Sequence, residues 1–204
     1  MFRYFLFIVF GCISLLISHF THFNWIIGSF SAHFSCMHLV LPAFIKHFGI
    51  LGAVLLYGSH LLKVQNILAF VAAKTGMIYS GYIYNRISFF NSVIVPAASI
   101  LLFIVHPIGS AVYFYSFYWF IPMILFVFFR KHIFAQALIS AFVAHALGSL
   151  VWLYCYQLAA PYWIAAMPVV LFERCLIALG IVATDTVYSS LLAMIKQLKA
   201  RIIS

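Results

Sequence analysis

The stretch MPVVLFERCLIALGIVATDTVYSSLL, residues 167–192, is an apolar run that contains both acidic residues of the chain, Glu173 and Asp185. The run is longer than the roughly 20 residues that an α-helix needs to cross a bilayer. An ionised side chain at the centre of a bilayer costs about 2.5–3.5 kcal/mol on insertion scales, so each acid is expected to pair with another group or to serve a site. This stretch therefore predicts a membrane helix with internal polar contacts.

The composition of the whole chain is that of a membrane protein. It is 67% hydrophobic and 6% charged, and its mean hydropathy is +1.18, whereas soluble domains carry about 25% charged residues. The apolar runs are continuous rather than alternating, which indicates helices and not a transmembrane barrel. We predict an all-α, multi-pass helix bundle of the inner or plasma membrane, with residues 1–204 forming a single integral membrane domain.

Polar or Pro/Gly-containing joints divide the chain into apolar segments. Turn signals stand at His106–Gly109 and at Gln157–Pro161. The basic residues lie near segment ends, which favours anchoring by the positive-inside rule over binding of nucleic acid by this chain of net charge +9. The seven segments are Tyr4–Ser18, Met37–Leu62, Gln65–Tyr84, Phe89–Val105, Ala111–Phe129, Ile133–Tyr156 and Trp163–Ser189.

The distribution of Lys and Arg predicts the topology. The basic C-terminal tail is placed in the cytoplasm, and counting back two segments at a time places Arg130-Lys131 and then Arg86 on the same side. Arg3 would then lie outside unless one early segment does not span. Met37–Leu62, interrupted at residues 46–49, is the first candidate, and Gln65–Tyr84 is the rival. We therefore predict six spans plus a re-entrant or broken segment, with both ends inside and an uncleaved first span.

Residues 19–38 differ from the rest of the chain, because they combine four His with several Phe, Asn24, Trp25 and small hydroxyl residues. We expect a loop on the outer side, which either lies at headgroup depth or covers a ligand site. The His spacing does not form a compact ligand set, so no metal is expected. The four cysteines form no CxxC pair, so free thiols are expected rather than a disulfide or a metal site.

The segment 133–156 carries small residues at helical spacing, which predict a close helix-packing or docking seam. His145 lies in the middle of this span and should face the bundle or a cavity. A structural hydrogen bond and a ligand contact are both open for it, and catalysis is disfavoured because no acid–base or nucleophile motif accompanies it. The seam residues are Ala137, Ser140, Ala141, Ala144 and Gly148.

The charged residues of the last segment leave alternatives open. Glu173 and Arg174 are about 100° apart around a helix, so we expect them to point in different directions. Glu173 is expected to face the interior, where His145 is a candidate partner. The open roles for it are a tie between helices, the wall of a substrate pocket and part of a proton relay. Asp185 is expected to be neutralised by Lys196 or by the loop at residues 130–132.

The strings FVAHALGSLVWLY (142–154) and APYWIAAMPVVLFERCLIALG (160–180) resemble the last two helices of the substrate-binding subunits of energy-coupling factor transporters. The resemblance covers residues 110–185. It implies six helices with both ends in the cytoplasm, capture of a vitamin or metal ion outside, and docking onto a transmembrane coupling subunit driven by ATPases. The substrate-binding residues that it implies are Asn24, His33, His145, Ser149, Trp152, Tyr162, Trp163 and Glu173.

We therefore expect a membrane-embedded substrate-capture subunit of a small-solute, vitamin-like uptake transporter, with no catalytic activity and no cofactor. The aromatic residues near the implied site would suit a planar, partly aromatic ligand. The alternatives are a structural or assembly subunit of a membrane complex and an intramembrane enzyme, although no HExxH or paired-acid motif supports the enzyme. A cavity bordered by Glu173 and His145 would favour capture, and a bond between these two residues in a filled bundle would favour a structural role.

Overall fold

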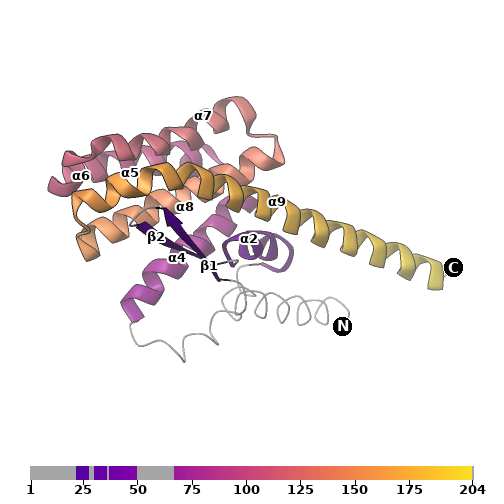
Figure 1. Cartoon of the computed structure of the whole chain (residues 1–204). Coiled ribbons are helices and arrows are strands. Elements are labelled where there is room, and N and C mark those ends of the chain that lie inside the picture. The colour runs from indigo at the N-terminus through magenta and orange to yellow at the C-terminus, as the bar shows by residue number, and fades with distance from the viewer. Residues whose placement is uncertain (1–21, 28–29, 36, 50–66, 204) are drawn as a thin grey trace.

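The computed structural model describes residues 22–27, 30–35, 37–49 and 67–203, and this part of the chain is predominantly helical (Figure 1). Two of the helical elements, η1 and η2, are a π-helical turn and a 3-10 helix. In chain order the elements are β1 (His22–Ile27), β2 (Phe30–Ser35), α2 (Met37–Phe48), α4 (Ile67–Asn85), η1 (Phe90–Ile94), α5 (Val95–Val105), α6 (Pro107–Ala111), η2 (Tyr113–Trp119), α7 (Phe120–Phe129), α8 (Ile133–Tyr156) and α9 (Ala160–Ile203).

Two helices, α8 and α4, follow their predicted apolar segments closely. α8 has the predicted bounds, and α4 agrees with its segment within two residues. α2 ends at Phe48, where Gly49 adopts a φ of 84° and its amide donates to the Ile45 carbonyl at 2.8 Å. The interruption predicted at residues 46–49 is therefore a helix end. The segment Tyr4–Ser18 and residues 50–62 of the second segment lie outside the described residues.

Two helices in the described ranges are long and apolar enough to cross a membrane, namely Ile133–Tyr156 and Ala160–Leu198. The apolar runs Phe90–Val105 and Tyr113–Phe129 are shorter. The second of these begins as the 3-10 helix η2, where the Ser116 hydroxyl donates to the Tyr113 carbonyl at 2.7 Å. Such a local bond competes with α-helical geometry. Membrane-spanning helices are thus present by length and composition, and six spans remain a prediction.

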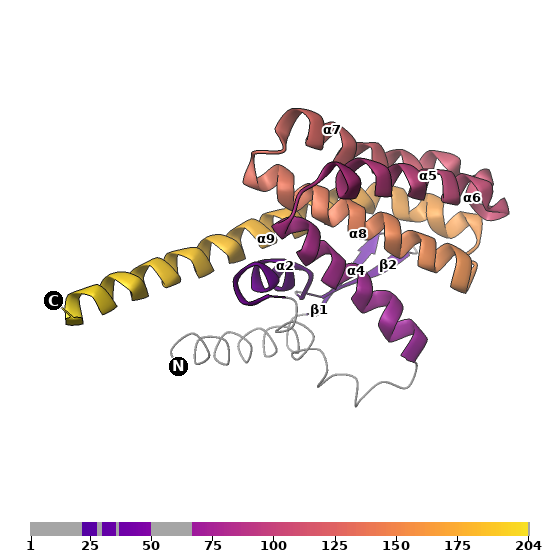
Figure 2. The same ribbon diagram turned by 180° about the vertical axis from the view of Figure 1, so that it is seen from behind.

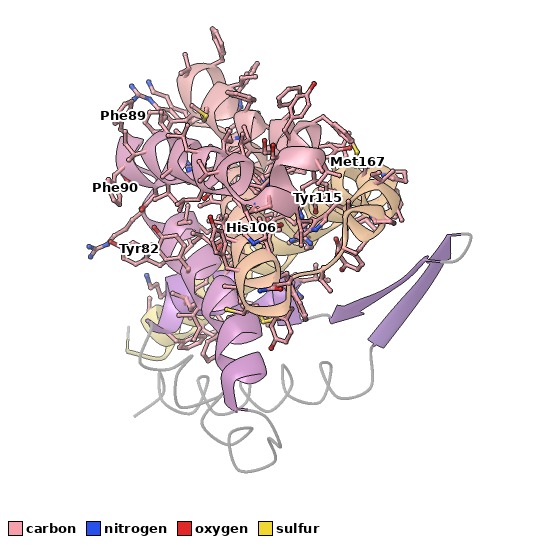
Figure 3. All side chains as sticks on the ribbon, turned by 90° about the vertical axis from the view of Figure 1, so that its left-hand side faces the viewer. Tyr82, Phe89, Phe90, His106, Tyr115 and Met167 are labelled. Atoms are coloured by element: carbon pink, nitrogen blue, oxygen red, sulfur yellow. The ribbon has the colours of Figure 1, made fainter. Side chains whose placement is uncertain are left out.

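The region expected as a loop contains a short antiparallel hairpin, which adds strands to the predicted all-α fold. β1 and β2 pair in a register that places Asn24 opposite His33. The sequences HFNWII and FSAHFS are rich in aromatic and branched residues, which favour extended backbone. Figure 3 shows the hairpin projecting away from the helices.

The helices pack on both sides of α8 and α9. α5, α6 and α7 lie on one side, and α2 and α4 lie on the other (Figures 1 and 2). The α8–α9 turn is closed by Gln157, whose left-handed φ of 50° confirms the predicted turn. α9 has 44 residues, so it is about 66 Å long at 1.5 Å per residue. Its C-terminal half extends beyond the other described helices (Figure 2).

The outward faces of the helices are apolar. Leu101 and Val105 of α5 are 67% and 77% exposed, and Val127 and Phe128 of α7 are 65% and 71% exposed. Only 33% of the most apolar window of α9 is buried, whereas the core helix of a soluble protein is mostly buried. Water-soluble monomers seldom expose apolar surface on this scale. The outer surface is therefore suited to lipid.

Candidate ligand-binding cavity

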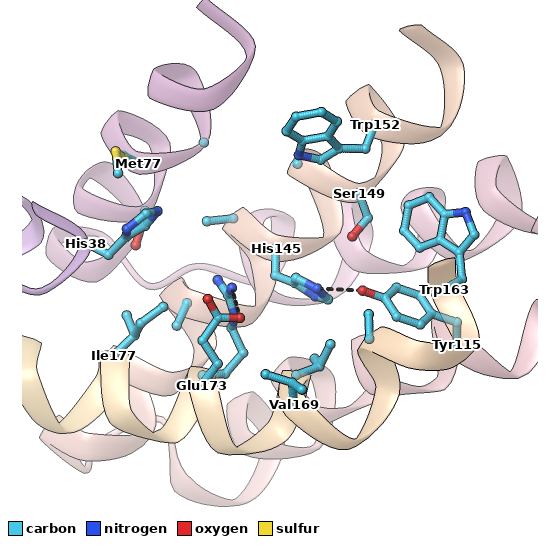
Figure 4. Close-up of a pocket in the computed structure, with 18 of the residues that line it drawn as sticks. His38, Met77, Tyr115, His145, Ser149, Trp152, Trp163, Val169, Glu173 and Ile177 are labelled. Atoms are coloured by element: carbon cyan, nitrogen blue, oxygen red, sulfur yellow. Dashed lines mark hydrogen bonds and ion pairs between the residues drawn. The ribbon is translucent and has the colours of Figure 1, made fainter. Parts of the chain in front are cut away.

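A cavity of about 470 Å³ lies between α4, α8 and α9, and α2 and η2 also contribute to its wall (Figure 4). Pockets that hold small molecules usually measure about 300–1,000 Å³. Residues three or four apart on a helix share one face, and this spacing brings residues 145, 149 and 152 of α8 and residues 162, 166, 169 and 173 of α9 to the cavity. The volume is therefore sufficient for a small organic molecule.

The structure gathers most of the predicted site residues around this cavity. Asn24 and His33 lie opposite each other in the hairpin, but their side chains are outside the described part of the structure. The other six line the cavity, and they are His145, Ser149 and Trp152 of α8 and Tyr162, Trp163 and Glu173 of α9. Their role in binding a solute remains a prediction.

His145 is held by hydrogen bonds at both ring nitrogens. The Trp119 indole N–H donates to Nδ1 at 3.3 Å, and Nε2 lies 2.9 Å from the Tyr115 hydroxyl. An indole nitrogen can only donate, so Nδ1 must accept. The ring is then neutral, with its proton on Nε2 donated to Tyr115 (Figure 4). Both nitrogens are engaged, so His145 acts as a fixed part of the wall rather than as a free base.

Glu173 and Arg174 form an ion pair that lines the cavity. The Arg174 Nη2 donates to Glu173 Oε2 at 2.7 Å, so the expectation that these neighbours diverge was wrong. The backbone does separate them by about 100°, but both side chains are long enough to bend back toward each other (Figure 4). The Arg174 Nε is buried and has no hydrogen-bond partner among the described residues.

Aromatic rings form the end of the cavity near η2. Trp163 is 2% exposed, and its ring lies 5.0 Å from that of Tyr115 and 5.2 Å from that of Phe103. The Trp163 indole N–H donates to the Leu158 carbonyl at 2.9 Å, which fixes the ring. Trp152 and Tyr162 are 44% and 42% exposed and therefore lie at the rim. A ligand would meet rigid ring faces inside and more accessible rings at the rim.

The small-residue seam of α8 packs within the chain. Ala137 and Ser140 are fully buried, and the Ser80 hydroxyl of α4 donates to that of Ser140 at 3.4 Å. A Cβ on Gly76 of α4 would lie 3.5 Å from the Ala144 carbonyl, which shows how closely the two backbones approach. The seam is thus a helix-packing contact between α4 and α8. Its members Ala141, Ala144 and Gly148 also line the cavity.

Asp185 lies outside the cavity, in a buried polar cluster. It is 1% exposed, and its Oδ2 accepts from Lys46 Nζ at 2.6 Å and from the Tyr84 hydroxyl at 2.7 Å. Its Oδ1 lies 2.8 Å from His47 Nε2. The expectation of Lys196 or the 130–132 loop as partner was wrong, because the last turn of α2 packs against α9 and brings Lys46 and His47 to the carboxylate. Asp185 therefore ties α2, α4 and α9 together.

Several lining residues had no signal in the sequence. Tyr115 stands in an aromatic-rich run, where nothing distinguishes it from its neighbours. Met77 and Ser80 of α4 reach the cavity from a distant segment, and so does His38 of α2, which ends the His-rich region 19–38, one interpretation of which was a loop over a ligand site. The sequence shows Arg174 next to Glu173, but it does not predict the direction of the Arg174 side chain. Within the described ranges, no group of three His, Cys, Asp or Glu residues is placed to hold a metal ion.

Comparisons with known protein families, with curated proteins and with solved structures found no match to this chain.

Proposed function

We propose that this chain is a multi-pass membrane protein that captures a small solute in the cavity between α4, α8 and α9. The observation that carries the proposal is the make-up of the cavity wall. Rigid aromatic rings stand at one end, and the Glu173–Arg174 ion pair stands beside them. A cavity of about 470 Å³ with few polar groups among apolar ones is the usual form of a small-molecule site.

The bilayer location is supported by the surface and by helix length. α5, α7 and α9 expose large apolar side chains, including Leu101, Val127 and Leu179. α8 and α9 each contain an apolar stretch long enough to cross the hydrocarbon core. We place the remaining apolar segments in the same bilayer, which gives a multi-pass protein whose basic loops face the cytoplasm.

The chemistry of the wall suggests a class of solute. The ion pair is neutral overall, and it offers a carboxylate acceptor beside the guanidinium donors of Arg174. An uncharged group with a donor and an acceptor side by side, such as an amide edge, would complement it. The rings of Tyr115 and Trp163 would contact a planar or aromatic body. A vitamin-like, net-neutral heterocycle fits both features.

The capture role fits an uptake system with separate parts. His145 is neutral and occupied at both nitrogens, so the cavity offers a binding wall rather than an acid–base catalyst. The resemblance to energy-coupling factor subunits implies a transmembrane coupling partner with ATPases as the source of energy. We propose such a partner for this chain.

A glutamine at position 173 tests the proposal. Glu173→Gln keeps the shape but removes the charged acceptor and leaves the Arg174 charge uncompensated. We expect solute uptake to fall at least about tenfold, a loss of 1.4 kcal/mol in binding, because hydrogen bonds to charged groups contribute about 1.5–3 kcal/mol. Thr186→Val on the exposed side of the same helix is the matched control.

Two measurements accompany the variants. Mass spectrometry of the tagged protein in mild detergent should recover a bound small molecule from the parent and from Thr186→Val, and much less from Glu173→Gln. Membrane insertion should be equal in all three. Uptake that is unchanged in Glu173→Gln would remove this residue from the site, and a protein that is always empty and without partners would favour a purely structural role.

A further inference from the structure

A second hollow, of about 520 Å³, lies where α4 ends and α8 begins. Arg86 enters it from the residues after α4, and Arg130 and Lys131 enter it from the loop between α7 and α8. Tyr84 and Gln136 complete its polar wall, and the Gln136 amide donates to the Arg130 carbonyl at 2.9 Å. We call it the basic hollow, because it brings Arg86 together with Arg130 and Lys131, which lie more than 40 positions further along the sequence.

The cations of the basic hollow have no carboxylate side chain available within the chain. The chain has two acidic residues, and both are engaged elsewhere, Glu173 by Arg174 and Asp185 by Lys46. Arg86 and Arg130 instead lie over the rings of Tyr82 and Phe126, at 6.0 and 5.5 Å, which hold the guanidinium groups in place without neutralising them. All three cations are exposed, so an anion from outside the chain can reach them.

The surroundings of the basic hollow indicate the source of that charge. Phe89 and Phe90 are 59% and 62% exposed, and Phe128 and Phe129 at the end of α7 are 71% and 49% exposed. Figure 3 shows Tyr82, Phe89 and Phe90 on one outer side of the helices. The Phe89 ring packs at 6.2 Å from that of Phe126, so this apolar surface continues to the ring under Arg130. A free, soluble anion gains no contact from such an apolar surface, whereas the acyl chains of a lipid can pack against it.

We propose that the basic hollow binds the phosphate headgroup of an anionic phospholipid, with the acyl chains lying along the exposed phenylalanines. Basic pockets between membrane helices on the cytoplasmic side are suited to such headgroups. Arg forms paired hydrogen bonds to phosphate oxygens, and Lys adds a mobile charge. This site rests on the bilayer location in the proposed function but not on solute capture, because it shares no lining residue with the cavity.

Native mass spectrometry of the full chain in neutral detergent tests the site, with phosphatidylglycerol and phosphatidylcholine as probes. We expect phosphatidylglycerol to bind in preference. Each cation near an anionic lipid contributes about fivefold in affinity, so R86Q/R130Q/K131Q should lower the affinity on the order of 100-fold. The matched control, K196Q/K199Q/R201Q, removes the same number of charges from the tail of α9 and should bind as the parent does.

Two further variants keep the result interpretable. R86K/R130K preserves charge and should retain the preference for phosphatidylglycerol, which separates lost binding from lost folding. Gln136→Glu places a carboxylate inside the hollow and should weaken phosphatidylglycerol binding by competing for the cations. Unchanged binding in both R86Q/R130Q/K131Q and Gln136→Glu would overturn the proposal, as would an equal loss in the tail variant.

A competition experiment with inorganic phosphate distinguishes a lipid phosphate headgroup from a free phosphate anion as the ligand of the basic hollow. If phosphate alone at millimolar concentration displaces the lipid from the parent, the site is one for a free anion and the lipid proposal fails. Equal binding of phosphatidylcholine would also overturn it. Solute binding in the cavity should be the same in R86Q/R130Q/K131Q as in the parent, so failure of this site and failure of the capture function give different results.

Discussion

Replacement of Asp185 with alanine should lower the free energy of unfolding by about 3–5 kcal/mol, which is the usual cost of breaking a buried ion pair from one side. The structure supplies the reason for the magnitude. Three groups hydrogen-bond to this carboxylate at 2.6–2.8 Å, and each bond to a charged group contributes about 1.5–3 kcal/mol. The Lys46 side chain is 37% exposed, so it can return to water and its bond contributes little. The His47 and Tyr84 bonds then account for the expected loss.

The assay is equilibrium unfolding in mixed micelles of mild detergent and increasing dodecyl sulfate, followed by far-ultraviolet circular dichroism. Thr186→Ala is the matched control, because its side chain is exposed and its hydroxyl donates to the Val182 carbonyl of its own helix. This control should change the unfolding free energy by no more than about 0.5 kcal/mol.

A double-mutant cycle with Tyr84 sharpens the test. Tyr84 is 4% exposed, so loss of Asp185 leaves its hydroxyl buried without this acceptor, at a cost of about 1–3 kcal/mol. Tyr84→Phe should therefore destabilise the parent but recover part of this cost in the Asp185→Ala background. Additive effects of the two changes, or a loss below about 1 kcal/mol for Asp185→Ala, would refute the assignment of this cluster as the tie between α2, α4 and α9.

Two further predictions concern packing and the cavity wall. Gly180→Ala should destabilise the fold by about 1–3 kcal/mol, because the new Cβ would lie 2.5 Å from Leu39 Cδ2. Gly148→Ala meets open space and should be neutral or slightly stabilising. The same micelle titration compares the two variants, and equal effects would show that α9 does not approach α2 so closely. Tyr115→Phe removes the acceptor of the His145 Nε2–H, so the free energy of unfolding should fall by about 1–3 kcal/mol, while a solute can still stack on the ring. Loss of solute binding with unchanged stability would contradict the assignment of the Tyr115–His145 bond as a structural contact.

The sequence predicts the helices well because length and continuity of apolar runs determine where a helix can lie. Ile133–Tyr156 is a continuous apolar run between a basic loop and a polar turn, and α8 has these bounds. α9 was expected to end at Ser189 but continues to Ile203. The tail contains Leu, Ala, Met, Lys and Gln, which have high helix propensity, so the helix outlasts the apolar run that predicted it.

The candidate site was predictable only where its residues share a helix face. Ser149 and Trp152 follow His145 at helical spacing, so the sequence alone places them on one side of α8. Contacts between distant segments were not predictable in this way. Lys46 and Asp185 are 139 positions apart. The hydropathy of α2 and of α9 does not predict that these two helices pack together, so the contact could not be predicted. Lys46 was interpreted as part of an interruption of a span, whereas in the structure it lies in the last turn of α2 and pairs with a buried carboxylate.

The scarcity of acid explains the placement of both acidic residues on α9. In a bilayer, a carboxylate is stable only beside a cation or several donors, and α9 packs against both α2 and α8, so its side chains can reach the interior of the bundle. Glu173 meets Arg174 at the cavity, and Asp185 meets Lys46, His47 and Tyr84 in the buried cluster. Each acid thus pairs with a cation that α9 or α2 itself carries. The cations at the ends of α4 and α7 receive none of this compensation, which is why we propose the basic hollow, and not the cavity, as the binding site of an external anion.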